Sequence, residues 1–449
     1  MTNVRRINIH PYKLPVVLVC CLISLNVRSA IAQSAKSNVF EPTVTREESA
    51  WIRDAVGISE TNAMAAADWL LSKRGRGSSA ALDYAAGNFL FQAGEEARAI
   101  DAYRQALEKM PAFRSARVNL ARLYLLRDQS TDAVALLREV VMDGQGSADV
   151  YLLLGHALLL TDAIISAETA YRNCLMLRPG DSDALLGLAR SLLPQDRPAE
   201  TLALSRELVR REPERREFRA LQANALLAMN REEDTAAVLE SARRLGLADS
   251  DMLALLADLH LNAGRIIEAC ELYEKVVASD KPSWPRMLRA FESMTLAGHT
   301  DAAVRLRNVM EKEAGKNRNG MSQGEMRTFF RVQGDLARLL GDSEGAMKHY
   351  QSLLREDPLD GRTMLRVAEL LQARDSFEDA AILLERAARV PEVQVEALVR
   401  HAQVEVQRER FGRAVELLEA AQTLEPRDHV GRYLEQVKRL EQISVTPKM

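Results

Sequence analysis

Prolines recur in this chain with a regular period, and this period limits the possible fold more than any other feature of the sequence. The separation of Pro111 and Pro179 along the chain is twice that of Pro179 and Pro213, and it equals the separation of Pro358 and Pro426. The underlying period is about 34 residues, which is typical of arrays in which each repeat buries its apolar face against its neighbours. The 449 residues therefore predict a linear array of small units and not one large globular core.

The same small and bulky residues recur inside each unit. In the clearest early copy they are Gly87, Gly94, Ala99, Tyr103 and Pro111. Small residues at the eighth and twentieth positions allow two antiparallel helices to approach closely, and the glycine between them ends the first helix. Aromatic residues make up only 5% of the chain, and Ala, Leu, Arg and Glu dominate it, which is typical of helices. We therefore expect an all-α fold in which each unit is a helical hairpin.

This pattern resembles the tetratricopeptide repeat family, and the resemblance covers most of the chain after residue 79. It implies an α-solenoid, a right-handed superhelix of about ten helical hairpins, whose concave groove binds a protein partner. The family's tryptophan near the fourth position is absent from every unit, and Cys174, Thr201 and Thr235 replace small alanines. The ten units are expected to begin near Ala80, Arg114, Ala148, Ser182, Arg216, Ser250, Trp284, Arg327, Gly361 and Val395.

The segment 1–32 has the features of a secretory signal peptide. Three Lys or Arg residues precede an uncharged stretch at 14–27, and an A-x-A cleavage site at 30–32 comes before Gln33. An uncleaved membrane anchor is the alternative, but the stretch at 14–27 is shorter than the roughly 20 apolar residues that span a bilayer. The expected mature protein starts at Gln33, is periplasmic or secreted, and has no integral membrane span.

The repeats do not fill the whole chain. The expected organisation is a signal peptide at 1–32, a linker at 33–46, an N-terminal capping hairpin at 47–79, repeats 1–7 at 80–317, an insertion loop at 318–326, repeats 8–10 at 327–428, and a C-terminal capping helix with its tail at 429–449. The insertion interrupts the period and is rich in Gly, Asn and Ser. An extended turn, a hinge or a partner-contacting loop would each fit it.

Motifs for catalysis or metal binding are absent from the sequence. It contains no HExxH, CxxC, P-loop or GxSxG motif, and no two histidines have i, i+4 spacing. The repeats leave no room for a catalytic domain, so we expect neither an enzyme nor a cofactor or metal site. The formal net charge of −3 gives no reason to expect a nucleic-acid partner.

The resemblance also implies that the ninth residue of each first helix faces the groove. We call these ten residues the ladder: Asn88, Arg122, His156, Arg190, Asn224, Asp258, Glu292, Asp335, Glu369 and Gln403. The first half of the ladder is polar or basic and the second half is acidic, with Arg289, Arg331, Arg366 and Arg400 interleaved. If exposed, these residues would contribute little to stability and could orient a partner by charge. Ordinary solvated surface is the alternative interpretation.

Some family members clamp a carboxyl-terminal peptide with two asparagines and several cations. Asn88 and Asn119 match the two asparagines, but Tyr84, Asp149 and Leu153 replace the cations. A clamp of that kind is therefore not expected. The leading hypothesis is a periplasmic scaffold that binds a protein partner along its groove. The alternative is a structural subunit of an envelope export or transport complex, for exopolysaccharide secretion or an energy-transducing outer-membrane system.

Overall fold

The computed structural model describes residues 40–279, 283–316 and 320–445. The signal peptide expected at 1–32, and the start of the linker expected at 33–46, lie outside these residues. The described residues form helices and connecting turns, with no strand. The all-α expectation is thus confirmed.

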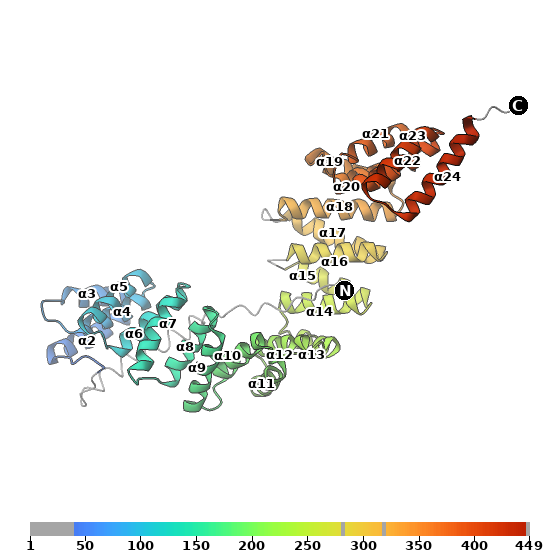
Figure 1. Ribbon diagram of the computed structural model, residues 1–449. Helices are drawn as coiled ribbons and strands as arrows, with labels where there is room; N and C mark the ends of the chain where they lie inside the picture. The colour runs from blue at the N-terminus through green and yellow to red at the C-terminus, as the bar shows by residue number, and fades with distance from the viewer. Residues whose placement is uncertain (1–39, 280–282, 317–319, 446–449) are drawn as a thin grey trace. The chain divides into compact units, whose positions relative to one another are not determined.

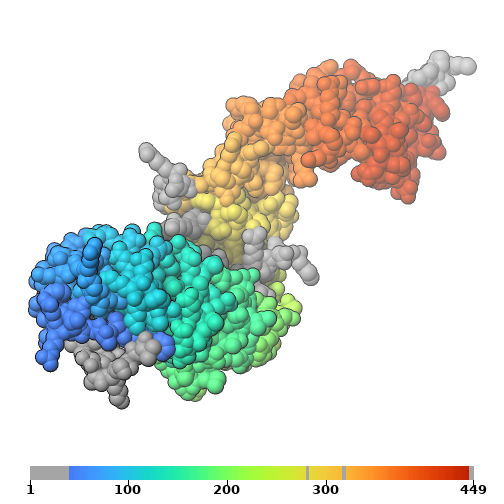
Figure 2. Space-filling view, turned by 60° about the vertical axis from the view of Figure 1, so that its left-hand side comes forward, coloured from blue at the N-terminus to red at the C-terminus, as the bar shows by residue number. Residues whose placement is uncertain are grey.

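Two compact units divide the helices. The N-terminal unit, residues 40–248, contains α2 (Arg46–Ser59), α3 (Ala63–Ser72), α4 (Ala80–Gln92), α5 (Glu96–Lys109), α6 (Arg114–Leu126), α7 (Ser130–Met142), α8 (Ala148–Leu160), α9 (Ile164–Leu177), α10 (Ser182–Leu192), η1 (Leu193–Gln195), α11 (Pro198–Arg211), α12 (Arg216–Ala228) and α13 (Glu232–Arg244). Within this unit successive hairpins pack side by side in chain order, and Figure 2 shows side chains filling the space between them, coloured blue to green.

The C-terminal unit, residues 249–445, contains the remaining helices. They are α14 (Ser250–Asn262), α15 (Ile266–Val277), α16 (Trp284–Leu296), α17 (Thr300–Lys316), α18 (Gln323–Leu339), α19 (Ser343–Glu356), α20 (Gly361–Gln372), α21 (Phe377–Ala387), α22 (Gln394–Gln407), α23 (Phe411–Leu424) and α24 (Asp428–Val445). Here too each hairpin packs against the next, and α24 packs on α23 after the last hairpin (Figure 1).

A left-handed residue ends the first helix of each of the ten repeat hairpins. Gly94, Gly264, Gly298 and Gly341 have positive φ, as their place in the period indicates. In the other six hairpins the same place is taken by Asp128, Asp162, Asp196, Asn230, Asp375 and Glu409, with φ between 56° and 58°. Asp and Asn tolerate this conformation better than most side chains, whereas Glu409 adopts it at a greater cost.

The glycine at the eighth position makes room for a tyrosine of the second helix. A Cβ atom on Gly87 would lie 2.7 Å from Cε1 of Tyr103, and one on Gly334 would lie 2.5 Å from Cε1 of Tyr350. Both tyrosines are almost completely buried. The missing side chain therefore admits an aromatic ring between the two helices of the hairpin.

The insertion expected at 318–326 is only partly a loop. Helix α18 already begins at Gln323, because Ser322 and Glu325 form a capping box that stabilises an earlier start. Helix α17 extends to Lys316. Some of the residues inserted between the seventh and eighth repeats therefore belong to the helices α17 and α18 and not to a loop. The boundary between the two units falls elsewhere, between Ala248 and Asp249.

Candidate functional site

In three repeats the ladder residue accepts a hydrogen bond from a tyrosine of the second helix. Tyr103 Oη donates to Asn88 Oδ1 at 2.7 Å, Tyr273 Oη donates to Asp258 Oδ1 at 2.5 Å, and Tyr350 Oη donates to Asp335 Oδ1 at 2.7 Å. Burial raises the pKa of all three tyrosines, so they remain protonated donors. The ninth position is therefore also a structural position, where an oxygen acceptor satisfies a buried hydroxyl.

The ten ladder residues differ in how far their side chains are buried. Asn88, Arg122, Asn224 and Asp335 are buried, and Gln403 is exposed. The other five are half-buried: His156, Arg190, Asp258, Glu292 and Glu369. The four buried members are therefore not part of a fully exposed charged surface. Arg122, for example, lies among side chains of its own and the preceding repeat, and burial lowers its pKa.

In the N-terminal unit, hydrogen bonds join the ladder of the first repeat to that of the second. Asn119 donates through Nδ2 to Asn88 Oδ1 at 3.0 Å and to Tyr84 Oη at 3.1 Å, and Arg122 donates to Asn119 Oδ1 at 3.0 Å. We call Tyr84, Asn88, Tyr103, Asn119 and Arg122 the polar cluster. The two asparagines of the clamp pattern are thus side by side, but they bond to tyrosines of the array itself.

In the C-terminal unit, arginines of the same repeat or of a neighbouring repeat pair with the acidic ladder residues. Arg331 pairs with Glu292 at 2.7 Å and with Asp335 at 3.5 Å, and Arg366 pairs with Asp335 at 3.5 Å. The interleaving expected from the sequence therefore corresponds to ion pairs between repeats. Most of these arginine side chains are about one third exposed, so their charges also face solvent.

Asp258 and Glu369, the first and last acidic residues of the ladder, also form ion pairs with arginines. Arg286 pairs with Asp258 at 2.8 Å, and Arg338 and Arg400 pair with Glu369 at 3.6 and 3.5 Å. Sequence reasoning missed Arg286 and Arg338. Arg286 occupies the third position of its unit and Arg338 the sixteenth of α18, whereas the sequence pattern indicated only the fifth, sixth and ninth positions of each unit.

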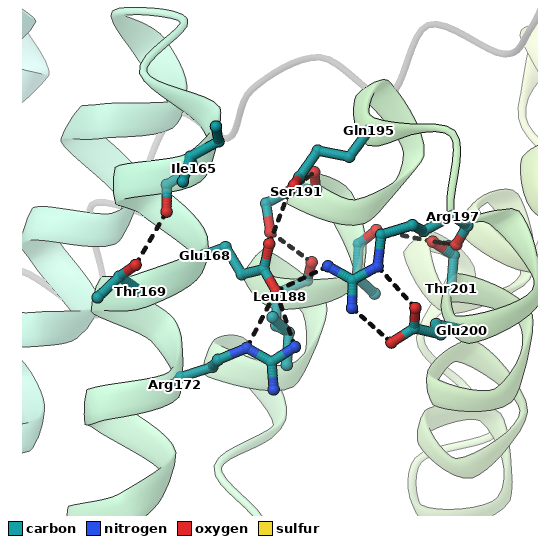
Figure 3. Close-up of polar contacts among 11 residues, drawn as sticks. Ile165, Glu168, Thr169, Arg172, Leu188, Ser191, Gln195, Arg197, Glu200 and Thr201 are labelled. Atoms are coloured by element: carbon teal, nitrogen blue, oxygen red, sulfur yellow. Dashed lines mark hydrogen bonds and ion pairs between the residues drawn. The ribbon is translucent and has the colours of Figure 1, made fainter.

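A second set of polar contacts links the third repeat to the fourth. It joins α9, the second helix of the third repeat, to the residues that precede α11, the second helix of the fourth. Glu168 of α9 accepts hydrogen bonds from Arg172, Gln195 and Arg197, and Arg197 also binds Glu200 with two bonds of 2.6 Å (Figure 3). Burial would raise the pKa of Glu168, but these three donors together lower it to about 2. The carboxylate is therefore ionised at neutral pH and links α9 to the turn before α11.

The described residues hold no cluster of His, Cys, Asp or Glu suited to a metal ion. None of their helices combines the length and the apolar character needed to cross a membrane. Cys174 and Cys270 are buried free thiols, and burial raises the pKa of each to about 11. At neutral pH neither is a reactive thiolate.

Comparison with known protein families finds the same repeat in both units. Models of the tetratricopeptide repeat match residues 90–157 and 331–395, one match in each unit. No curated protein matches the chain. Among solved structures, YrrB, described as a tetratricopeptide repeat protein with an unusual peptide-binding site, is 17% identical, with a TM-score of 0.35 over 42% of this chain and 92% of its own.

Two further solved structures are similar over different lengths. Pseudomonas aeruginosa pilF is 18% identical, with a TM-score of 0.34 over 47% of this chain and 92% of its own. The Cut9–Hcn1 hetero-tetramer of the APC/C is 14% identical, with a TM-score of 0.32 over 94% of this chain and 88% of the matched chain. The two family matches show that this chain contains tetratricopeptide repeats in both of its units, within an array of helical hairpins.

Proposed function

We propose that this protein is a non-enzymatic scaffold of the periplasm or cell exterior that binds a protein partner along the ladder. Tetratricopeptide repeats generally serve in protein–protein interaction, and the observation that carries the proposal is the line of half-buried charges on successive first helices. The buried members, such as Asn88 and Asp335, fix the geometry. The half-buried members, such as Arg190 and Glu369, provide the contacts.

Ion pairs between repeats support this role, because they hold the charges in place without removing them from solvent. Arg366 and Arg400 each pair at 3.5 Å with a ladder carboxylate and remain about one third exposed. A partner carboxylate can therefore replace or extend these pairs at little cost, since partly exposed ion pairs contribute only about 0 to 1 kcal/mol. A partner side chain of opposite charge gains orientation and a faster association.

Charge reversal in the C-terminal unit tests the proposal. The variant R366E/R400E should capture less of the partner from an envelope extract than the wild-type chain does, while circular dichroism shows unchanged helicity. The matched control is R355E/R389E, which makes the same change of charge at exposed positions, one in α19 and one just after α21. Equal capture by both double variants would contradict a role for the ladder.

The same capture separates the leading function from its alternative. A general scaffold should retain several unrelated proteins, each lost with R366E/R400E. A structural subunit of an export or transport complex should retain one fixed set of envelope proteins in constant ratio. Quantitative mass spectrometry of the captured material distinguishes these outcomes.

The proposed location rests on the sequence before the described residues. Fractionation of a Gram-negative host, followed by amino-terminal sequencing, should recover the protein in the periplasm or medium with Gln33 at its start. A longer membrane-bound form would argue for the uncleaved anchor.

A further inference from the structure

The segment before α2 is in contact with the repeats. The backbone N–H of Arg114 donates to the carbonyl oxygen of Phe40 at 3.1 Å, and Ser115 Oγ donates to Glu41 Oε1 at 2.6 Å. Phe40, Glu41 and Pro42 are half-buried, whereas residues 43–45 are exposed. The contact is therefore confined to the first residues of a segment that the sequence predicts to be a linker.

These contacts satisfy the amino-terminal end of α6. Arg114 is the first residue of this helix, and Phe113 at the N-cap position contributes no side-chain hydrogen bond. The first N–H groups of a helix have no partner within the helix. The carbonyl group of Phe40 supplies that partner from a distant part of the sequence.

Glu41 also lies beside the polar cluster. Its carboxylate interacts electrostatically with Tyr84, and Tyr84 in turn is bonded to Asn119. Burial raises the pKa of Glu41, while the hydrogen bond from Ser115 and the charge of Arg114 act in the opposite direction. The hydrogen bond from Ser115 and the charge of Arg114 thus partly offset the cost of burying an ionised Glu41 here.

We propose that residues 40–42 occupy, within the same chain, the place where α4 and α6 bind an extended partner segment that presents a backbone carbonyl followed by a carboxylate. The inference rests on the proposed function and adds to it a class of partner and a built-in competitor. A backbone carbonyl and a carboxylate are the two groups that Arg114 and Ser115 recognise here. An acidic partner segment with the same order of groups would make the same contacts.

A short tether strengthens this competition. Residues 42–45 connect Glu41 to α2, and α2 is itself fixed because Glu48 accepts a hydrogen bond of 2.7 Å from the backbone N–H of Ser79. A short tether gives an effective concentration in the mM range. A free segment with the same contacts therefore binds weakly until the internal one leaves.

The test uses the purified chain and a fluorescent peptide with the sequence of residues 36–45. The variant F40A/E41A should bind this peptide at least about tenfold more tightly than the wild-type chain does in fluorescence anisotropy, because the internal competitor is lost. Adding S115A to that variant should weaken binding again. The control T43A/V44A, in the exposed part of the same segment, should behave as the wild type.

Hydrogen exchange gives a second measurement that does not depend on the peptide. The amide of Arg114 should exchange slowly in the wild type and T43A/V44A. It should exchange rapidly in F40A/E41A, because loss of the Glu41 carboxylate and the Phe40 ring should release the segment, and with it the backbone carbonyl of residue 40 that accepts this hydrogen bond. Equal peptide binding by the wild type and F40A/E41A, no binding by either, or unchanged exchange at Arg114 would each overturn the inference. The proposed function is judged separately, by partner capture with R366E/R400E in the other unit.

Discussion

The two units use the same position of the repeat in different ways. In the N-terminal unit the ladder carries amides and cations, and Asn88 and Arg122 are joined through Asn119 by hydrogen bonds. In the C-terminal unit the ladder is mostly acidic, and arginines from neighbouring repeats pair with it. Yet Asn88 and Asp335 both accept a bond from the tyrosine of their second helix.

This difference shows which property of the ninth residue the hairpin requires and which property can vary. A buried tyrosine hydroxyl needs an oxygen acceptor at the ninth position, and the side chains of Asn and Asp both provide one. The charge of the acceptor is not fixed by the hairpin, provided that a neighbouring arginine can balance it. The surface presented to a partner can therefore change along the array, while hairpins that carry the tyrosine, such as those of Tyr103 and Tyr350, keep their internal bond.

The largest expected effect comes from filling the space that the tyrosine occupies. Because a Cβ on Gly334 would lie 2.5 Å from Tyr350, the variant G334V should displace the ring, break its bond to Asp335 and destabilise the C-terminal unit by about 3 kcal/mol or more. Hydrogen exchange should show lost protection in that unit alone. In the control G324A, in the same helix, the added Cβ meets no atom within 4 Å, so stability should stay the same or rise. Uniform loss along the whole chain would contradict independent units.

Removing the acceptor should cost more than removing its charge. D335L leaves the buried hydroxyl of Tyr350 and the charges of Arg331 and Arg366 unsatisfied, so we expect a loss of about 3 kcal/mol. D335N keeps an acceptor for the tyrosine and loses only the charge, which should cost about 1–2 kcal/mol. Chemical denaturation measures both. Equal losses would show that the charge, and not the acceptor, is what the ninth position requires.

The Glu168 link tests whether the N-terminal unit also depends on ion pairs. E168Q should lower the free energy of unfolding by about 2 kcal/mol at pH 7, because three donors lower the pKa of this carboxyl from 4.5 to about 2. A depressed carboxyl pKa stabilises the folded state above the unfolded pKa. That stabilisation is lost as the pH falls towards 2. The difference between wild type and variant should consequently shrink between about pH 5 and pH 2. A constant difference across this range would assign the effect to packing.

The smallest expected effect concerns the end of a first helix, where both units use left-handed residues. Glu409 has a φ of 57°, and E409G should stabilise the C-terminal unit by about 0.5–1 kcal/mol. D128G, at the same place in the N-terminal unit, should gain less, since Asp tolerates this conformation better. Thermal unfolding would detect both shifts, and destabilisation by E409G would show that its side chain makes a compensating contact.

The sequence period predicts helix starts well because it is set by packing between neighbours. Eight first helices begin at the expected residues, from Ala80 to Trp284 and at Gly361. Helix α18 begins at Gln323 instead of Arg327, because a local capping box acts independently of the period. The Asp and Asn residues that end first helices could also have been predicted, since Asp128, Asp162 and Asp196 recur with the period of the array, in the place of Gly94.

The environment of the ladder was harder to predict. A repeat pattern says which face of a helix a residue lies on, but not whether a tyrosine from the second helix reaches it, as Tyr103 reaches Asn88. The ion pairs depend on long, flexible side chains, and Arg331 reaches Glu292 across 39 positions of sequence. The contact of Phe40 with Arg114 has no period or motif that could predict it.

Glu48 gives the start of the array a property that none of its repeats has alone. One carboxylate oxygen accepts from the backbone N–H of Thr45 at 2.9 Å, and the other accepts from that of Ser79 at 2.7 Å. Thr45 and Ser79 are the N-cap residues of α2 and α4. The single side chain of Glu48 therefore caps the amino-terminal ends of both helices. Fraying of the first hairpin and of the first repeat is consequently coupled, and a protease that cuts between residues 49 and 78 would loosen both. Any shortened version of the protein made for crystallisation should therefore begin before Thr45.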